Sequence, residues 1–149
     1  MIRVALIPGD GVGPEVVREA ERVMDACVSA GLADIRTELF PHGADHYLAT
    51  GETLSDASFA RLRDDFDAIL LGAVGDSRVP DGRHARDILL GLRFRLDLYI
   101  NFRPARLRLP ELSPLRSADE RPIDFVIFRE NTEGLYTGAG RIESAGGPD

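Results

Sequence analysis

The stretch IRVALIPGDGVGPE, Ile2–Glu15, decides the fold class. Its first six residues are apolar apart from Arg3, which is typical of a strand buried in a mostly parallel sheet. A glycine-rich turn follows, and apolar residues then recur at helical spacing over residues 16–27. Pro14 suits the first turn of this helix and Gly31 its end. Strand, turn and helix in this order predict an α/β fold with a mostly parallel sheet flanked by helices.

The rest of the chain repeats this alternation of strands and helices. Apolar runs predict further strands, and helical spacing between them predicts two further helices. The predicted strands are Ile35–Phe40, Asp67–Gly72, Leu98–Arg103 and a buried Ile123–Phe128, and the predicted helices run from a cap at Ser55 or Asp56 to about Asp65 and from about His84 to Leu96. Pro104 is expected to limit pairing of its strand. Residues 109–122 are predicted to be a loop, and the glycine-rich end after Tyr136 is assigned neither strand nor helix.

The composition is that of a globular chain, with 44% apolar and 29% charged residues among 149. The net charge of −7 argues against a general binder of nucleic acid or membrane surfaces, which needs a basic surface. Residues 84–108 nevertheless hold six arginines against two aspartates, which favours a small anionic ligand. No apolar run approaches the roughly 20 residues that span a bilayer. The first strand starts at the N-terminus without a signal peptide, so a cytoplasmic location is expected.

Cysteine and histidine, which often carry chemistry, are sparse. Cys27 is the only cysteine, so no disulfide framework is expected. Its place in the helical repeat predicts a small core side chain. His42 and His46 are four residues apart and could share a helix face as a metal pair, but no third ligand has suitable spacing. They are interpreted as surface polar groups.

The turn Gly9–Gly13 occupies the place where a dinucleotide fingerprint would lie. Its glycines alternate instead of following the G-x-G-x-x-G spacing, and Glu15 at the helix start would repel a pyrophosphate. A standard Rossmann site is therefore rejected, and the glycines are expected to serve the turn and the close approach of a ligand edge. The loop Ala73–Gly82 follows a predicted strand, at the position where open α/β sheets bind ligands. An ordinary surface connection is the alternative.

Three arginines stand in unusual settings. Arg93 and Arg103 interrupt the otherwise apolar run Leu89–Leu107, and Arg129 directly follows an apolar strand. A guanidinium matches a carboxylate or phosphate with two parallel hydrogen bonds. Each arginine alone is explained as an ion-pair partner of the many acids. Three together favour an anion site.

Four segments, in this order, carry a resemblance to a known family. They are Leu6–Glu15 (LIPGDGVGPE), Leu70–Gly75 (LLGAVG), Leu98–Ala105 (LYINFRPA) and Arg129–Tyr136 (RENTEGLY). Together they resemble the isocitrate/isopropylmalate dehydrogenase family of β-decarboxylating dehydrogenases, most closely its isopropylmalate branch. Members are more than twice this long, so the chain is similar to their N-terminal portion and incomplete at its C-terminus. The resemblance implies that residues 1–100 begin the large α/β cofactor-side domain and that residues 101–149 begin a second, dimerisation and substrate domain.

The resemblance implies oxidative decarboxylation of a (2R)-hydroxy acid that carries a second carboxylate, with NAD or NADP as oxidant and Mg or Mn at the keto oxygen. By motif position, Arg93, Arg103 and Arg129 would bind the malate moiety, and Tyr136 would be the acid near the enol. Arginine suits a carboxylate that must stay in place while its neighbour departs. Cations near a tyrosine favour proton exchange. The cofactor would contact Gly11, Val12, Gly13, Glu15, Gly75, Asp76 and Asp87.

The substrate tail in this family meets the helix just before Arg93. Leu89 and Leu90 lie there, and a carboxylate against leucine would be costly, so an isopropyl tail, and hence 3-isopropylmalate, is favoured. The segment Glu130–Gly134 instead resembles the isocitrate, homoisocitrate and tartrate/D-malate branches, which remain alternatives. Arg86 and Asp87 also depart from the acid and threonine that family members often carry near the cofactor.

The resemblance places the catalytic lysine and the metal-binding aspartates beyond Asp149, and all 18 basic residues of this chain are arginine. The chain alone is therefore expected to be inactive, and the full-length protein is expected to be a cytoplasmic homodimer of leucine biosynthesis. Two alternatives remain open. One is a non-catalytic regulatory or assembly subunit of the family that keeps the arginines, and the other is a generic carboxylate-binding α/β module.

Overall fold

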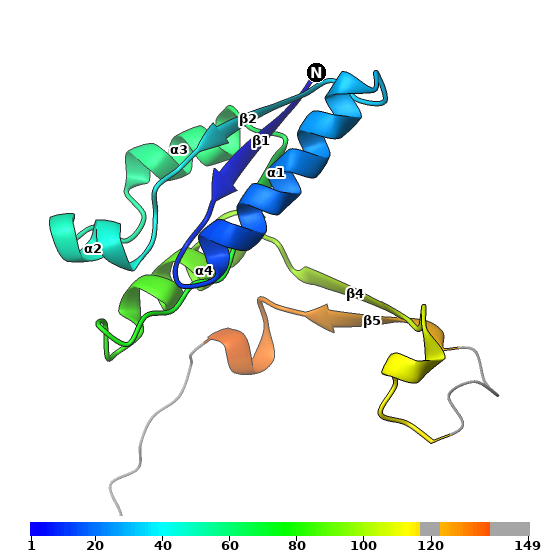
Figure 1. Cartoon of the computed structure of the whole chain (residues 1–149). Coiled ribbons are helices and arrows are strands. Elements are labelled where there is room, and N and C mark those ends of the chain that lie inside the picture. Colours follow the sequence, from blue (N-terminus) through cyan, green and yellow to red (C-terminus); the bar gives the residue numbers. More distant parts are fainter. Residues whose placement is uncertain (117–122, 138–149) are drawn as a thin grey trace, which may run out of the picture. The chain divides into compact units, whose positions relative to one another are not determined.

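The computed structural model describes residues 1–116 and 123–137 of the chain. The chain divides into two compact units, Met1–Leu96 and Asp97–Asp149. Each unit is described by itself, and the chain is drawn in Figure 1. The predicted strand–helix alternation is present in both order and type.

The first unit is built on a three-stranded parallel sheet with the order β2-β1-β3. The strands are β1 (Ile2–Ile7), β2 (Ile35–Leu39) and β3 (Ala68–Leu71). In the central strand, Val4 pairs with Thr37 on one side and with Ala68 on the other. The helices that connect and follow the strands are α1 (Gly13–Ser29), α2 (Ala44–Thr50), α3 (Asp56–Asp64) and α4 (Arg83–Arg95). The predicted parallel α/β sheet is confirmed.

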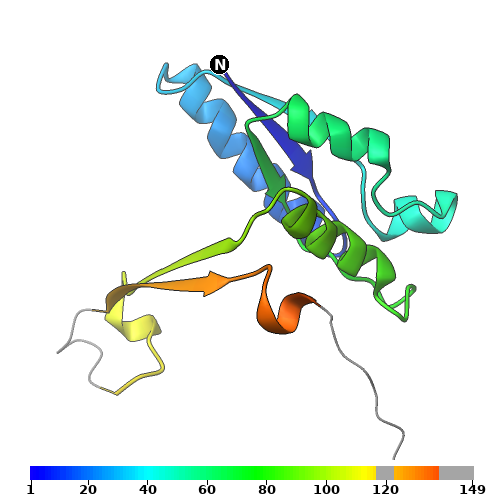
Figure 2. The same cartoon turned by 180° about the vertical axis from the view of Figure 1, so that it is seen from behind.

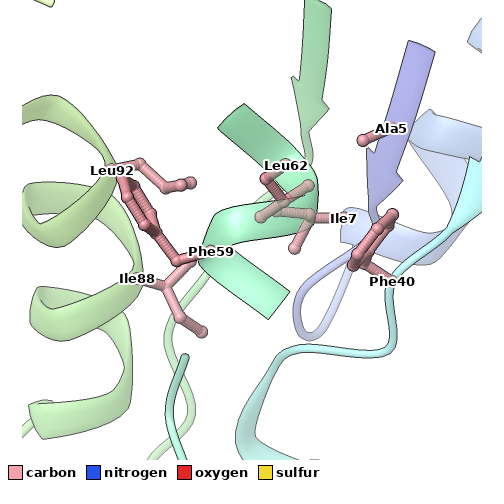
Figure 3. Packing of buried hydrophobic residues seen from close by; sticks show 7 residues of the cluster. All are labelled: Ala5, Ile7, Phe40, Phe59, Leu62, Ile88 and Leu92. Atoms are coloured by element: carbon pink, nitrogen blue, oxygen red, sulfur yellow. The ribbon is translucent and has the colours of Figure 1, made fainter. Parts of the chain in front are cut away.

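Alternate residues of β1 point to opposite faces of the sheet and build two cores. Ala5 and Ile7 join the larger cluster, which Figure 3 shows, with Phe40 and side chains from α3 and α4; these are Phe59, Leu62, Ile88 and Leu92. Val4 and Leu6 pack with Val17 of α1. The sheet therefore has α1 on one face and α3 and α4 on the other, as the two opposite views in Figures 1 and 2 show.

The apolar stripe predicted on α1 is only partly buried. Val17 is buried and Met24 packs against the same cluster, but Val16 and Val23 are 49% and 64% exposed. Cys27 is half-buried rather than a core residue. A helix lying on one face of a three-stranded sheet buries only the side chains that face the strands, so the prediction was wrong for these positions.

The N-cap expected at Ser55 or Asp56 is Ser55. Its hydroxyl oxygen accepts a hydrogen bond from the Ser58 amide at 3.2 Å, which satisfies one of the free N–H groups at the start of α3.

Among the residues the structure describes, no helix is long and apolar enough to cross a bilayer.

The second unit contains an antiparallel pair, β4 (Ile100–Arg106) and β5 (Asp124–Glu130), and two 3-10 turns, η1 (Pro110–Leu112) and η2 (Gly134–Thr137). The strand predicted at the position of β5 is present, but its residues are exposed. The prediction of burial was wrong because the apolar sequence was taken for a strand covered on both faces. Pro104 does not stop pairing, since a strand with a single neighbour leaves one edge free. Part of the predicted loop, residues 117–122, and the predicted irregular end, residues 138–149, lie outside the described residues.

Candidate functional site

One carboxylate ties together the loops at the carboxyl ends of all three parallel strands. Asp10 lies in the turn after β1. Its Oδ1 accepts the amide of Ala44, after β2, at 2.6 Å, and its Oδ2 accepts the amide of Gly75, after β3, at 2.8 Å. The same Oδ2 lies 2.8 Å from Nε2 of His84 on α4. Asp10 therefore fixes the edge of the sheet where ligands bind in open α/β folds.

The electrostatics of this group favour an ionised carboxylate. Burial would raise the pKa of Asp10, but the hydrogen bonds from Ala44, Gly75 and His84 outweigh it and hold the pKa below its usual range. An ionised acceptor assigns the proton of the buried His84 ring to Nε2. That ring stacks on Tyr47, with centroids 6.1 Å apart. Neither Asp10 nor His84 was predicted as a site residue, although an aspartate in a strand-end turn was a usable signal.

Packing explains most glycines of the turn after β1. A Cβ atom at Gly9 would collide with the carbonyl oxygen of Ala73, and one at Gly13 with that of Pro8. Gly11 is different, because nothing lies within 4 Å of the position where its Cβ would be. Gly11 has a left-handed φ of +55°, which favours glycine whatever the space around it, and it is exposed like Val12. The close approach of a ligand to this turn stays a prediction.

The start of α1 is not built as a phosphate cradle. The amide of Gly13 donates to the carbonyl of Asp10 at 2.8 Å, and the amide of Glu15 donates to that of Val12 at 3.1 Å. Glu15 itself supplies negative charge in the first turn. These contacts use N–H groups that would otherwise face an anion, in keeping with the rejection of a standard Rossmann site.

The loop after β3 is held by an arginine. Asp76 accepts hydrogen bonds from Nε and Nη2 of Arg78 at 3.0 and 2.7 Å, and these lower the pKa of Asp76 to about 2. Nη2 of Arg78 also lies 2.7 Å from Asp45 in the first turn of α2. The carboxylate of Asp76 is thus engaged by the protein itself, and the loop is tied to α2.

Asp87 lies on a different part of the first unit. It accepts a long hydrogen bond from the Thr53 hydroxyl at 3.4 Å, and Nε of Arg83 lies 3.9 Å away. These residues line a polar pocket together with Tyr47 and Glu52. Of the predicted cofactor contacts, Gly13 and Gly75 are joined by hydrogen bonds to Asp10, whereas Asp87 lines this separate pocket.

Two of the predicted substrate arginines share one face of the β4–β5 pair. Arg129 lies opposite Asn101, and Arg103 lies opposite Ile127. Directly opposed residues, and residues two apart on one strand, point to the same side of a sheet. The guanidinium carbon of Arg129 also lies 5.5 Å from the ring centre of Tyr136, the predicted acid. The second unit therefore brings three predicted site residues together.

Among the described residues, none of the three arginines forms an ion pair. Within residues 1–116 and 123–137, no carboxylate lies within 4.0 Å of the nitrogens of Arg93, Arg103 or Arg129. Eight other arginines do have such a partner: Arg22, Arg61, Arg63, Arg78, Arg83, Arg86, Arg95 and Arg106. The explanation of the three as structural ion-pair partners is not supported. The expected apolar surroundings are wrong for Arg103 and Arg129, which are exposed, whereas Arg93 is half-buried.

α4 presents the predicted tail-binding residues beside Arg93. Ile88 and Leu92 are buried in the core, while Leu89 is 36% exposed and Leu90 is half-buried. Leu89 and Arg93 are four residues apart and are neighbours on the helix surface. An apolar side chain therefore adjoins a guanidinium that has no acid partner among the described residues. Arg93 belongs to the first unit and Arg103 and Arg129 to the second, so their convergence on one ligand stays a prediction.

The two histidines lie close together, but not on one helix face as the sequence had suggested. His42 precedes α2 rather than sharing its face with His46, and the rings meet edge to face at 5.2 Å. His42 is 4% exposed, so its interpretation as a surface group was wrong. No group of three potential ligands occurs among the described residues.

Acid is expected to destabilise the first unit through His42. Neither ring nitrogen has a hydrogen-bond partner in the described structure. Burial, aided by the charge of His46, lowers the pKa of His42 below 6.5. The backbone of Thr53 and the charge of Glu52 act in the opposite direction and are outweighed. The unfolded chain then binds the proton better, so stability falls as the pH drops below 6.5, by at most about 1.4 kcal/mol per pH unit. Urea unfolding between pH 7.5 and 5 should show a flatter dependence for His42→Phe than for the wild type. Equal slopes would contradict this origin. His46→Asn removes only the lesser cause of the lowered pKa and should flatten the dependence less than His42→Phe.

Comparison with known proteins identifies the family of the chain. A model of the isocitrate/isopropylmalate dehydrogenase family matches residues 3–148. The chain belongs to this family. Among curated members, the 3-isopropylmalate dehydrogenase of Beutenbergia cavernae is 46% identical over 147 residues, which cover 99% of the chain and 42% of the relative. That of Mycobacterium tuberculosis is 48% identical over 148 residues, with the same coverage. The chain thus spans about two fifths of the length of these family members.

Solved structures of the family share the fold. Isocitrate dehydrogenase from Methylococcus capsulatus is 29% identical with a TM-score of 0.76 over 98% of this chain and 40% of that one. A β-decarboxylating dehydrogenase from Thermococcus kodakarensis is 36% identical, with a TM-score of 0.64 over 90% of this chain and 35% of that one. The recognition of the family from four sequence motifs is confirmed.

Proposed function

We propose that this chain carries the substrate-carboxylate-binding arginines of an NAD(P)- and Mg-dependent dehydrogenase that oxidatively decarboxylates a (2R)-hydroxy acid, with 3-isopropylmalate favoured. The observation that supports this most is the state of Arg93, Arg103 and Arg129. They stand at the family's motif positions and have no carboxylate partner in the described structure. Eight other arginines there do have one. Arg3, Arg18, Arg36, Arg108 and Arg116 also lack one among the described residues, so the motif positions and the unpaired state together set the three apart. Unpaired guanidinium groups are available for a dicarboxylate.

The roles of the chain's own groups follow from this proposal. The arginines hold the carboxylate that remains, so that the hydroxyl-bearing carbon and the departing carboxylate keep a fixed orientation. Tyr136, whose ring faces Arg129, supplies the proton to the enol. Bound NAD or NADP would take up hydride and bound Mg or Mn would polarise the keto oxygen. The described residues bring no group of three metal ligands together. The roles proposed for this chain's residues therefore do not include holding the metal. The residues proposed to contact the cofactor are Gly11, Val12, Gly13, Glu15, Gly75, Asp76 and Asp87.

Leu89 and Leu90 favour 3-isopropylmalate over isocitrate, homoisocitrate and tartrate or D-malate. The segment Glu130–Gly134 is the competing indicator, and its first carboxylate is engaged by its own backbone. The Glu130 carboxylate accepts the amides of Thr132 and Glu133, each at 2.7 Å, and so folds the segment on itself. The corresponding whole protein is proposed to be a cytoplasmic homodimer of leucine biosynthesis, with the first unit on the cofactor side and the second in dimerisation and substrate binding.

Substrate preference tests the proposal. Expressed from its complete reading frame, the protein should give its highest kcat/KM with 3-isopropylmalate when compared with isocitrate, homoisocitrate and D-malate, using NAD or NADP with Mg. Leu89→Ser should lower kcat/KM for 3-isopropylmalate about 10- to 100-fold, the effect of losing one apolar contact in a pocket, and should spare D-malate. Leu32→Ser, at a residue 78% exposed, is the matched control. Preference for isocitrate would overturn the substrate assignment, and absence of any turnover would favour a non-catalytic subunit.

A further inference from the structure

The sequence contains two asparagines, Asn101 and Asn131, and each contacts one of the two predicted substrate arginines of the second unit. Asn101 precedes Arg103 by two residues in β4, and Asn131 follows Arg129 by two residues at the end of β5. Nε of Arg103 donates to Oδ1 of Asn101 at 2.7 Å, and Nε of Arg129 donates to Oδ1 of Asn131 at 3.2 Å. The same contact thus occurs twice on one face of the strand pair.

Asn131 is itself firmly held. Its side chain belongs to a residue only 3% exposed, and its backbone amide donates to the carbonyl of Tyr99 at 2.9 Å, which extends the strand pairing by one residue. Asn101 lies directly opposite Arg129 in the ladder. The two amide oxygens are therefore fixed by the strands rather than by flexible side chains alone.

An asparagine oxygen on Nε leaves an arginine able to bind an anion. An acceptor on Nε restrains the guanidinium and leaves its two Nη groups, the end of the fork, for a carboxylate. An amide oxygen does this without adding charge, so the arginine keeps its full positive charge. An aspartate at the same place would accept the same hydrogen bond and would also neutralise the arginine.

We propose that Asn101 and Asn131 are positioning residues that hold Arg103 and Arg129 with their Nη edges free, and that this face needs amides rather than carboxylates to bind a substrate carboxylate. The inference rests on the proposed function of the two arginines. Asparagine and aspartate are nearly equal in shape and both accept a hydrogen bond from Nε, so a merely structural role would tolerate either residue. Binding of a substrate carboxylate, in contrast, requires the uncharged amide.

The contact can be measured without any ligand. In ¹H–¹⁵N spectra of the 149-residue chain, the Nε–H groups of Arg103 and Arg129 should exchange with water more slowly than that of Arg108, whose guanidinium has no hydrogen-bond partner in the described residues. Asn101→Ala and Asn131→Ala should each speed the exchange of their own arginine only. Exchange as fast as that of Arg108 in the wild type would overturn the positioning role.

The charge requirement is tested by titrating 3-isopropylmalate into the same chain. Asn131→Asp and Asn101→Asp should keep the slow Nε–H exchange and the thermal unfolding temperature but raise Kd at least about tenfold, because an adjacent acid opposes the bound anion. Phe102→Asp, on the other face of β4, is the control for added charge. Unchanged binding by both aspartate variants, with Arg129→Ala impaired, would overturn the inference. If the wild type shows slow exchange but binds no 3-isopropylmalate, the proposed function fails and the positioning contact stands.

Discussion

Replacing Asp10 with alanine is expected to lower the free energy of unfolding of the first unit by about 3–5 kcal/mol. The change leaves the amides of Ala44 and Gly75 and the ring of His84 without their acceptor, and each buried donor left unpaired costs about 1–3 kcal/mol. Since a domain is stable by only about 5–15 kcal/mol, this loss should be visible as a large shift of the urea midpoint.

A control variant and the pH dependence separate the network from general effects at Asp10. Asp25→Ala removes an exposed carboxylate of α1 and should change stability by less than about 0.5 kcal/mol. Because the folded-state pKa of Asp10 is lowered, its charged-state contribution is present at neutral pH and is lost as the pH falls below the ordinary carboxyl range. A loss below about 1 kcal/mol for Asp10→Ala at pH 7, the size of a single ordinary hydrogen bond, would show that the carboxylate does not hold the three loops.

Replacing Arg129 or Arg103 with alanine is expected to raise the Kd for 3-isopropylmalate about 10- to 100-fold, because each removes a charge-assisted, two-point contact worth about 1.5–3 kcal/mol. Lysine should rescue only part of this loss, since it offers a point charge and not a planar fork. The second unit should remain folded, because both side chains are exposed.

Arg106 offers a matched control for these variants. It lies on β4 like Arg103 but on the opposite face, and its guanidinium is 3.3 Å from Asp124. Arg106→Ala removes the same charge from the same strand and should leave Kd within about twofold, as expected for an exposed ion pair. Equal losses for Arg106→Ala and Arg103→Ala would mean that the net charge, and not the site, attracts the ligand.

The sequence predicted those features whose information is local. The strand and helix periods from Ile2 to Leu96 gave the parallel α/β unit, and Ser55 was one of two expected caps. The motif around Arg129 pointed to a guanidinium that has no acid partner in the part of the chain that the structure describes. Local pattern suffices for these features because period and capping depend on neighbours in the chain.

Features that depend on distant residues were missed. Asp10 and His84 are 74 residues apart, and the local sequence around each residue does not predict their contact. His42 was interpreted as exposed because its burial depends on Phe40 and the loop near Thr53. The apolar β5 was expected to be buried, yet strand period alone does not say what covers a sheet.

The central claim is that Arg93, Arg103 and Arg129 bind a dicarboxylate hydroxy acid, and calorimetry on the 149-residue chain tests it most directly. 3-Isopropylmalate is compared with 2-hydroxy-4-methylpentanoate, which keeps the tail, the hydroxyl and one carboxylate but lacks the second. We expect saturable binding of 3-isopropylmalate that weakens with salt, and at least about tenfold weaker binding of the monocarboxylate. Equal affinity for the two acids, or no binding of 3-isopropylmalate, would contradict the claim.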